Sequence, residues 1–147
     1  MPQRYDYKPF PLDKPVAATK QDSAWRPVLR VVIFYGHRRT PPIEAIVDTG
    51  ADMTIFDADI ARGMGLKVEQ GDIYEFGGIA ASAKVTGYIH KVKLLVAGDT
   101  IETPVVFADG IVSGGLLGQV GFFNHFIATF DWTPHPPCFE VQRISRN

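Results

Sequence analysis

The sequence predicts a mostly β, barrel-like domain with one or two short helices. Short apolar stretches rich in β-branched and aromatic residues alternate with turns that contain glycine or proline. The chain lacks both internal repeats and the regular alternation of strands and helices that a parallel sheet requires. With 147 residues, 46% of them hydrophobic, it is long enough to form one domain with a substantial core.

Seven segments carry the strand signal, and most of them pair as hairpins. Gly36 and the prolines that follow it turn the first strand into the second, and Gly98-Asp99 turns the fourth into the fifth. A proline-rich turn at residues 133–137 joins the last two strands. The predicted strands are residues 28–35, 43–47, 68–76, 84–96, 101–108, 127–132 and 139–144.

Two segments favour helices. Residues 57–63 form a short candidate, with Asp57 placed to cap its N-terminus and Gly63 or Gly65 placed to end it. The second candidate, residues 119–126, has large apolar residues at roughly helical spacing, namely Val120, Phe123 and Phe126.

The first 27 residues have a different character from the rest. They contain several prolines and little hydrophobic periodicity, which is typical of an extended arm. Such an arm could pack along the domain, wrap a partner subunit, or cover a cleft as a propeptide does. We therefore divide the chain into an N-terminal arm, residues 1–27, and a folded domain, residues 28–147.

The most informative segment lies where the second predicted strand ends. The apolar residues 45–47 deliver Asp48 to a Thr49-Gly50 turn, and a second apolar stretch follows at residues 53–56. Asp-Thr-Gly alone is common in turns, because all three residues favour such positions. The apolar flanks are unusual for a surface turn, and a carboxylate at the end of a buried strand is costly unless something holds it. We expect Asp48 to lie in a cleft.

Composition and charge exclude several other functions. The formal net charge is −1 with scattered basic residues, so no nucleic-acid-binding surface is indicated. The single cysteine, Cys138, excludes an internal disulfide and zinc sites built from several thiolates, and the histidines are not spaced as metal ligands. The N-terminus lacks the apolar segment of a secretory signal, and no apolar run is long enough to span a membrane. We expect a soluble, cytoplasmic protein.

Three motifs together resemble those of the retropepsin-like aspartic proteases. Asp48-Thr49-Gly50-Ala51 is similar to the catalytic turn of that family, and the match extends to Asp52 and Thr54. Gly77-Gly78-Ile79-Ala80 falls about where the family has its mobile flap. Leu116-Leu117-Gly118 is similar to the signature that opens a helix in the family. The resemblance covers roughly residues 29–141, and the final predicted hairpin looks more like the cellular and prokaryotic members than the viral ones.

This resemblance implies a retropepsin-like acid-protease half-barrel and an aspartic endopeptidase that needs no metal or organic cofactor. Hydrolysis by this chemistry uses two carboxylates, and the other Asp-Gly pair, Asp109-Gly110, lacks an apolar lead-in strand. A homodimer acting on peptide or protein substrates is therefore implied. The implied catalytic residues are Asp48, Thr49 and Gly50. The implied substrate-binding residues are Ala51, Asp52, Gly77, Gly78 and Ile79.

Three other functions remain open at this point. The first is a catalytically silent module that binds peptides or partners on the same fold. The second is a structural β-domain whose N-terminal arm does the biological work. The third is a glycosidase that uses Asp48 with Asp52, but these residues lie too close together on one turn to flank a sugar bond.

Overall fold

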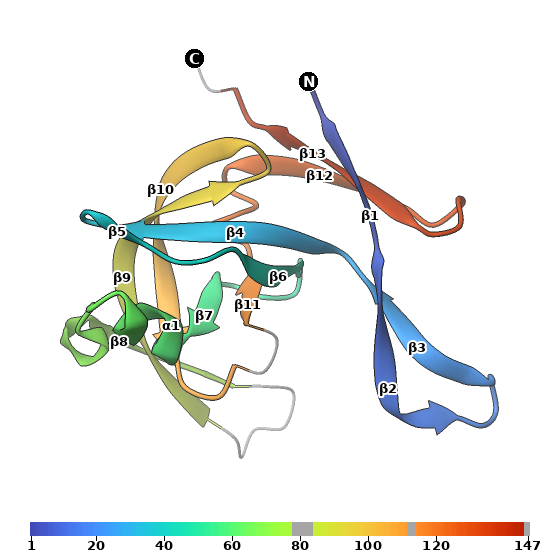
Figure 1. Cartoon of the computed structure of the whole chain (residues 1–147), viewed down its shortest axis with the longest axis horizontal. Helices are drawn as coiled ribbons and strands as arrows, with labels where there is room; N and C mark the ends of the chain where they lie inside the picture. The colour runs from blue at the N-terminus through green and yellow to red at the C-terminus, as the bar shows by residue number, and fades with distance from the viewer. Residues whose placement is uncertain (78–83, 112–113, 146–147) are drawn as a thin grey trace.

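A sheet of eight strands closes on itself to form a barrel (Figure 1). The computed structural model describes residues 1–77, 84–111 and 114–145. The strands are β4 (Val28–Tyr35), β5 (Arg38–Arg39), β6 (Ile43–Val47), β7 (Ile55–Asp57), β8 (Asp72–Gly77), β9 (Lys84–Val96), β10 (Asp99–Ala108) and β11 (Gly115–Leu117). They follow the order β5-β4-β6-β11-β7-β10-β9-β8, and β4 also pairs with β9, which closes the ring. The predicted mostly β fold is confirmed.

The two hairpins predicted in the barrel are present. Strand β4 pairs antiparallel with β6, and β9 pairs antiparallel with β10. The turn between β9 and β10 consists of Ala97 and Gly98, which have φ values of +50° and +79°. A two-residue turn with both φ values positive matches the right-handed twist of the strands that it joins.

The remaining strands form two smaller sheets. Strands β1 (Gln3–Asp6), β13 (Cys138–Arg143) and β12 (Phe126–Asp131) make a three-stranded sheet in the order β1-β13-β12. Strands β2 (Lys8–Val16) and β3 (Gln21–Arg26) make a two-stranded hairpin, which projects away from the barrel (Figure 1). The prolines of this N-terminal segment gave no indication of strands, because proline weakens a strand signal even where an edge strand tolerates it.

The helix α1 (Ala58–Gly63) forms where the sequence predicts it, and Asp57 caps it. One side-chain oxygen of Asp57 accepts a hydrogen bond of 2.9 Å from the N–H of Asp59. The other accepts a bond of 3.1 Å from the N–H of Ile111, in the loop after β10. Within the described ranges, no helix is both long and apolar enough to cross a membrane.

Replacing Asp57 with alanine should lower the free energy of unfolding by about 1–2 kcal/mol, since it removes a helix cap and leaves the N–H of Ile111 without its acceptor. Chemical denaturation measures this change. Asp57→Asn retains a side-chain oxygen and should be less destabilising. If both variants lost the same free energy of unfolding, the oxygen that caps the helix would not contribute to stability.

The second predicted helix, residues 119–126, is wrong: the chain forms a series of turns there. Gly121 has a φ of +102°, outside the helical region. A Cβ atom at this glycine would lie 2.6 Å from Oγ1 of Thr54, so the local backbone is set by close packing against the residue that precedes β7. The N–H of Gly121 donates to the side chain of Asn124. Apolar spacing alone could not reveal this contact.

The predicted strand over residues 68–76 begins later than expected. Its first part is a 3₁₀ turn, η1 (Val68–Gln70), which buries Val68 in the core. Strand β8 starts only after Gly71, where the chain comes so close to β9 that a side chain would collide with the carbonyl of Ile89. The burial of one apolar side chain therefore overrides the strand pattern.

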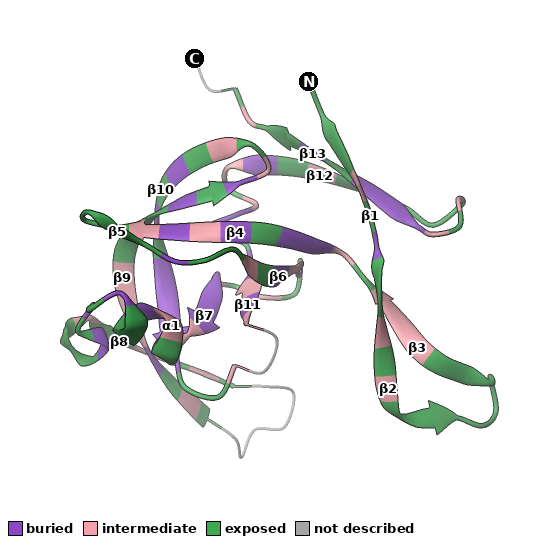
Figure 2. Ribbon diagram, viewed as in Figure 1, coloured by how far each residue is buried: buried purple, intermediate pink, exposed green. Residues whose placement is uncertain are grey.

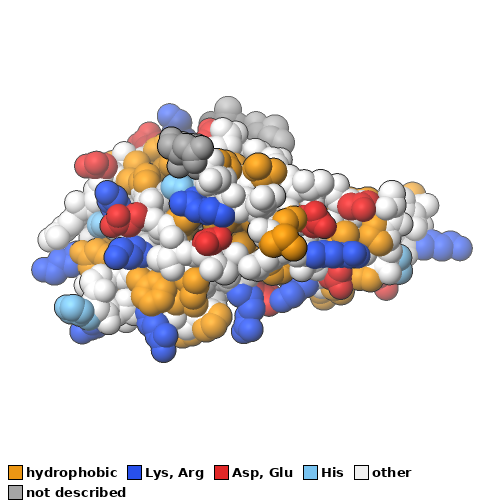
Figure 3. Space-filling model, turned by 90° about the horizontal axis from the view of Figure 1, so that it is seen from above, with side chains coloured by type: hydrophobic (Ala, Val, Ile, Leu, Met, Phe, Trp, Pro, Cys, Tyr) orange, Lys and Arg blue, Asp and Glu red, His pale blue; other side chains and the backbone are white. Residues whose placement is uncertain are grey.

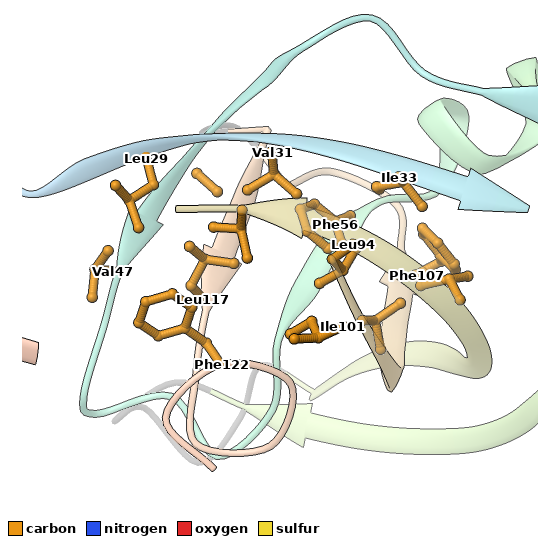
Figure 4. Packing of buried hydrophobic residues seen from close by; sticks show 14 of the residues in the cluster. Leu29, Val31, Ile33, Val47, Phe56, Leu94, Ile101, Phe107, Leu117 and Phe122 are labelled. Atoms are coloured by element: carbon orange, nitrogen blue, oxygen red, sulfur yellow. The ribbon is translucent and has the colours of Figure 1, made fainter. Parts of the chain in front are cut away.

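The main core fills the barrel. Buried side chains from β4, β6, β7, β9, β10 and β11 converge there (Figures 2 and 4). Phe122, from the turns that follow β11, packs into the same core. The labelled members in Figure 4 are Leu29, Val31, Ile33, Val47, Phe56, Leu94, Ile101, Phe107, Leu117 and Phe122. A second, smaller cluster surrounds Ile55, Val106 and Ala108. This second cluster forms the base of the site described below.

An ion-pair cluster centred on Arg62 joins α1 to η1 and to the loop after β10. Arg62 lies 2.7 Å from Asp109, 2.6 Å from Glu69 and 3.0 Å from Asp59. Hydrogen bonds from Arg62 hold the pKa of Asp109 and the pKa of Glu69 below their ordinary values.

Arg62→Met should raise the pKa of both carboxyl groups toward the ordinary range, as NMR titration would detect. Because these pKa values are lowered in the folded state, the pairs stabilise the fold above about pH 4, and this contribution is lost as the pH falls further. Wild type and Arg62→Met should therefore differ most in urea unfolding near neutral pH and converge in acid. A difference that is independent of pH would point to lost packing of the Arg62 side chain instead.

Candidate active site

Strand β6 carries Asp48 to the edge of the barrel. The short strand β11 lies between β6, with which it is parallel, and β7, with which it is antiparallel. The N–H of Asp48 donates to the carbonyl of Leu117 at 2.9 Å, which extends the pairing by one residue. Leu116 and Leu117 thus fix the position of the turn that follows β6.

The turn itself orients the carboxylate of Asp48. Oδ1 of Asp48 accepts a hydrogen bond of 2.9 Å from the N–H of Gly50, and the N–H of Ala51 donates to the Asp48 carbonyl at 3.2 Å. A Cβ atom at Gly50 would lie 3.3 Å from the same oxygen, so a larger residue would crowd the carboxylate. Asp48 is partly buried, whereas Thr49 and Gly50 are exposed.

Thr54 connects the segment after the Asp48 turn to the neighbouring segments through hydrogen bonds. It is fully buried, its N–H donates to the carbonyl of Val120, and its carbonyl accepts from the N–H of Val106. Its hydroxyl oxygen accepts a hydrogen bond of 3.1 Å from the N–H of Gly118. A buried hydroxyl that is bonded in this way rigidifies its surroundings, because breaking the bond would leave a buried N–H unpaired.

At Gly118 the segment that follows β11 lies closest to residues 51–53, which follow the Asp48 turn. A Cβ atom there would lie 2.5 Å from the carbonyl oxygen of Met53 and 2.6 Å from that of Ala51. The next two N–H groups, of residues 119 and 120, donate to the carbonyls of Ala51 and Asp52. The Leu116-Leu117-Gly118 signature therefore ends a strand and holds the turn that carries Asp48, and the expectation that it opens a helix is wrong.

An open groove of about 360 Å³ lies beside this turn. It brings together five residues that the sequence predicts for the site: Asp48, Gly50, Ala51, Asp52 and Gly77. Gly77 ends β8 on the far side of the groove. Thr49 is exposed and is not among the lining residues. Gly78 and Ile79 lie outside the described residues.

Sequence reasoning missed the apolar walls of the groove. They consist of Met53, Ile55, Tyr74, Phe76, Val85 and Leu116. The rings of Tyr74 and Phe76 stack with their centroids 6.0 Å apart, on the face of β8 that packs against the second apolar cluster. Tyr74 and Phe76 alternate with polar residues in the sequence, which indicates a strand with one apolar face. This pattern does not tell whether that face lies against the core or beside a groove.

The chemistry available in the groove is that of carboxylates in apolar surroundings. Asp48 and Asp52 are its two acidic residues, and the described lining contains no lysine, arginine or histidine. Across the described ranges, no group of three or more His, Cys, Asp or Glu side chains is placed to hold a metal ion. The groove can therefore offer a carboxylate as a proton acceptor or donor, with apolar walls for the rest of a ligand.

Comparisons with known proteins found a matching family and similar solved structures. A family model described as aspartyl protease matches residues 34–120, which are 87 of the 147 residues. Among solved structures, the EIAV protease complexed with the inhibitor HBY-793 is similar in fold. It is 24% identical with a TM-score of 0.46, and the match covers 64% of this chain and 82% of that chain. A search of curated proteins found no match.

Proposed function

Since the chain belongs to the aspartyl protease family, we propose that it is an aspartic endopeptidase whose active site is completed by a second copy of itself. The observation that carries the proposal is the placement of Asp48. Its carboxylate is oriented by the N–H of Gly50 and lies at the side of an apolar groove. A carboxylate in that position can act on a water molecule beside a bound peptide.

The need for a second copy follows from the number of suitable carboxylates. The chemistry uses two acids that share one proton, so that one activates a water molecule while the other protonates the carbonyl oxygen of the substrate. Each chain has one Asp-Thr-Gly turn. Asp109, in the other Asp-Gly sequence, pairs with Arg62 and does not line the groove. The second acid is therefore Asp48 of the partner copy, across a two-fold axis.

Each residue of the turn then has a role. The two Asp48 side chains hold the attacking water between them and share one proton, as the two carboxylates of this chemistry do. Thr49, which is exposed in the single chain, hydrogen-bonds across the axis and fixes the two turns relative to each other. Gly50 leaves room for the backbone of the substrate.

The substrate is a peptide bound in extended form. Ala51 and Asp52 line one side of the groove and contact the backbone of the peptide, while Gly77, Gly78 and Ile79 cover it as a flap. Main-chain hydrogen bonds to an added strand provide affinity, and pockets for alternate side chains provide specificity. The walls formed by Tyr74, Phe76 and their neighbours favour apolar side chains beside the scissile bond.

Two assays test the function. Denatured protein should be cleaved, and a pepstatin-type inhibitor should abolish the cleavage at both acidic and neutral pH. Binding of peptides without cleavage would instead favour the catalytically silent module.

Subunit mixing tests whether the site is shared. When wild-type chains and Asp48→Asn chains are mixed equally and allowed to exchange, about a quarter of the dimers are fully wild type, so activity should fall to about a quarter. If the activity instead fell only to about half of that of the same amount of wild-type protein, in proportion to the share of wild-type chains, a site shared between two copies would be overturned.

A further inference from the structure

We propose that the hairpin β2–β3, residues 8–26, is a clasp that binds the barrel of the second copy and sets the stability of the dimer. This inference rests on the proposed function, in which two copies meet at Asp48. It assigns a role to the N-terminal segment, for which the sequence left three possibilities open.

The hairpin lacks the support that such an element normally needs. Strands β2 and β3 pair with each other and, in the described chain, with no further strand. Most of their residues are exposed, including nearly all of β2 (Figure 2). An isolated two-stranded hairpin is at best marginally stable in water. The part of the hairpin beyond its base therefore needs a further surface to pack against.

The base of the hairpin is held firmly, which gives its projection a fixed direction. Trp25 packs against the main core and makes an edge-to-face contact with His135, at a centroid distance of 5.6 Å. Just before the hairpin, the buried Tyr7 packs edge-to-face on Phe139. Lys8 pairs with Glu44 of β6 at 2.7 Å. A rigid base costs less conformational entropy on association than a flexible tail would.

The base also lies directly beside the catalytic turn. The residue after β3, Pro27, accepts a hydrogen bond of 2.8 Å from the N–H of Val47, the residue before Asp48. In Figure 1 the hairpin and the end of β6 lie on the same side of the barrel. A partner that places its own Asp48 opposite this one must occupy that side, so the hairpin extends along the flank of the partner.

The surface of the hairpin suits contact through side chains. Phe10 pairs with Ala24 across the strands, and Leu12 follows on the same face, so these three make an apolar strip. Arg26 lies over the ring of Phe10 at 5.8 Å and borders the strip with positive charge. Seen from the side on which β12 and β13 lie, the molecule mixes hydrophobic side chains with charges of both signs (Figure 3). Aromatic residues and arginine are enriched at protein–protein contacts, so Phe10 and Arg26 suit the hairpin to such a contact.

Two further observations concern how the hairpin can act. Strand β2 contains Pro9, Pro11 and Pro15, which lack an N–H, so this strand is poorly suited to extend a sheet by edge pairing. No residue of the hairpin lines the groove beside Asp48, so within one chain the hairpin does not cover the active site.

The first test measures dimer dissociation by analytical ultracentrifugation. Replacing residues 10–24 with Asn-Gly joins the paired residues Pro9 and Trp25 through a two-residue turn and keeps the base intact. This shortened chain should dissociate at least about tenfold more readily, as should the double variant Phe10→Ser and Leu12→Ser. Leu95→Ser, on an exposed barrel residue, is the matched control and should leave dissociation unchanged. Unchanged dissociation of both hairpin variants would overturn the proposal.

The second test uses the wild-type chain, so it does not depend on the folding of a variant. Chains labelled with ¹⁴N and ¹⁵N are mixed and treated with a lysine-specific cross-linker. Links from Lys14 or Lys20 of the hairpin to barrel lysines should include links that join one labelled and one unlabelled chain. Links found only within single chains would overturn the clasp. Both tests are independent of catalysis, so a dimer that forms through the hairpin but does not cleave peptides would refute the proposed function alone.

Discussion

Asp48→Asn should reduce kcat for peptide hydrolysis by about 10³-fold or more while the fold and the dimer persist. Asparagine can neither accept nor release the proton that the mechanism requires. Its side-chain oxygen can still accept the hydrogen bond that the N–H of Gly50 now donates to Asp48, so the turn retains its shape. The effect is therefore expected in the rate of the chemical step and not in protein stability.

The matched control for this variant is Asp109→Asn. It makes the same chemical change in the other Asp-Gly sequence, at an exposed residue outside the groove. Its kcat and KM should match the wild-type values, although its bond to Arg62 is weakened. Circular dichroism and ultracentrifugation establish whether each variant is folded and dimeric. Substantial hydrolysis by folded, dimeric Asp48→Asn would remove Asp48 from the mechanism.

Gly118→Ala should have the second-largest effect. The added methyl group would lie within 2.6 Å of two backbone carbonyl oxygens, those of Ala51 and Met53, so the segment after Asp48 must move. Overpacking of this kind costs about 1–3 kcal/mol of stability. Because a displacement of about 1 Å near the reacting atoms can cost about 10²-fold in rate, we expect a further loss of kcat that the stability change does not explain.

Gly63→Ala is the corresponding control. Gly63 is the last residue of α1, and a Cβ atom there would meet nothing within 4 Å. The substitution should leave stability unchanged or slightly increased, because alanine favours the helix. Thermal unfolding and steady-state kinetics of both variants test the comparison. If Gly118→Ala retained full activity at a temperature where it is folded, the clamp between β11 and the turn would not control catalysis.

Much of the barrel could be predicted because its signals are local. Strands β4 and β9 were recognised from their own β-branched and aromatic residues, and Asp57 was recognised as a helix cap from its place before α1. The pairing of β4 with β9 that closes the barrel was not predictable in this way. It joins segments about 60 residues apart in the sequence, and its register depends on how the whole core packs.

The same division applies to the site. Asp48 and its turn stood out, because a carboxylate between two apolar stretches is unusual in a short sequence window. The walls at Tyr74 and Phe76 did not stand out, since an alternating strand has the same pattern whether it faces a core or a groove. The helix expected at residues 119–126 failed for a related reason: the backbone at Gly121 is set by contact with Thr54, a residue distant in sequence.

Local residue chemistry was thus sufficient to identify a β-rich protein with one carboxylate at the end of a buried strand, because strand propensity, turn chemistry and the cost of burying an acid act over a few neighbouring residues. The tertiary structure decided what surrounds that acid. It placed β11 between β6 and β7, arranged the apolar walls of the groove, and directed the N-terminal hairpin away from the barrel. These features depend on contacts between distant segments, which form only when the complete core is packed.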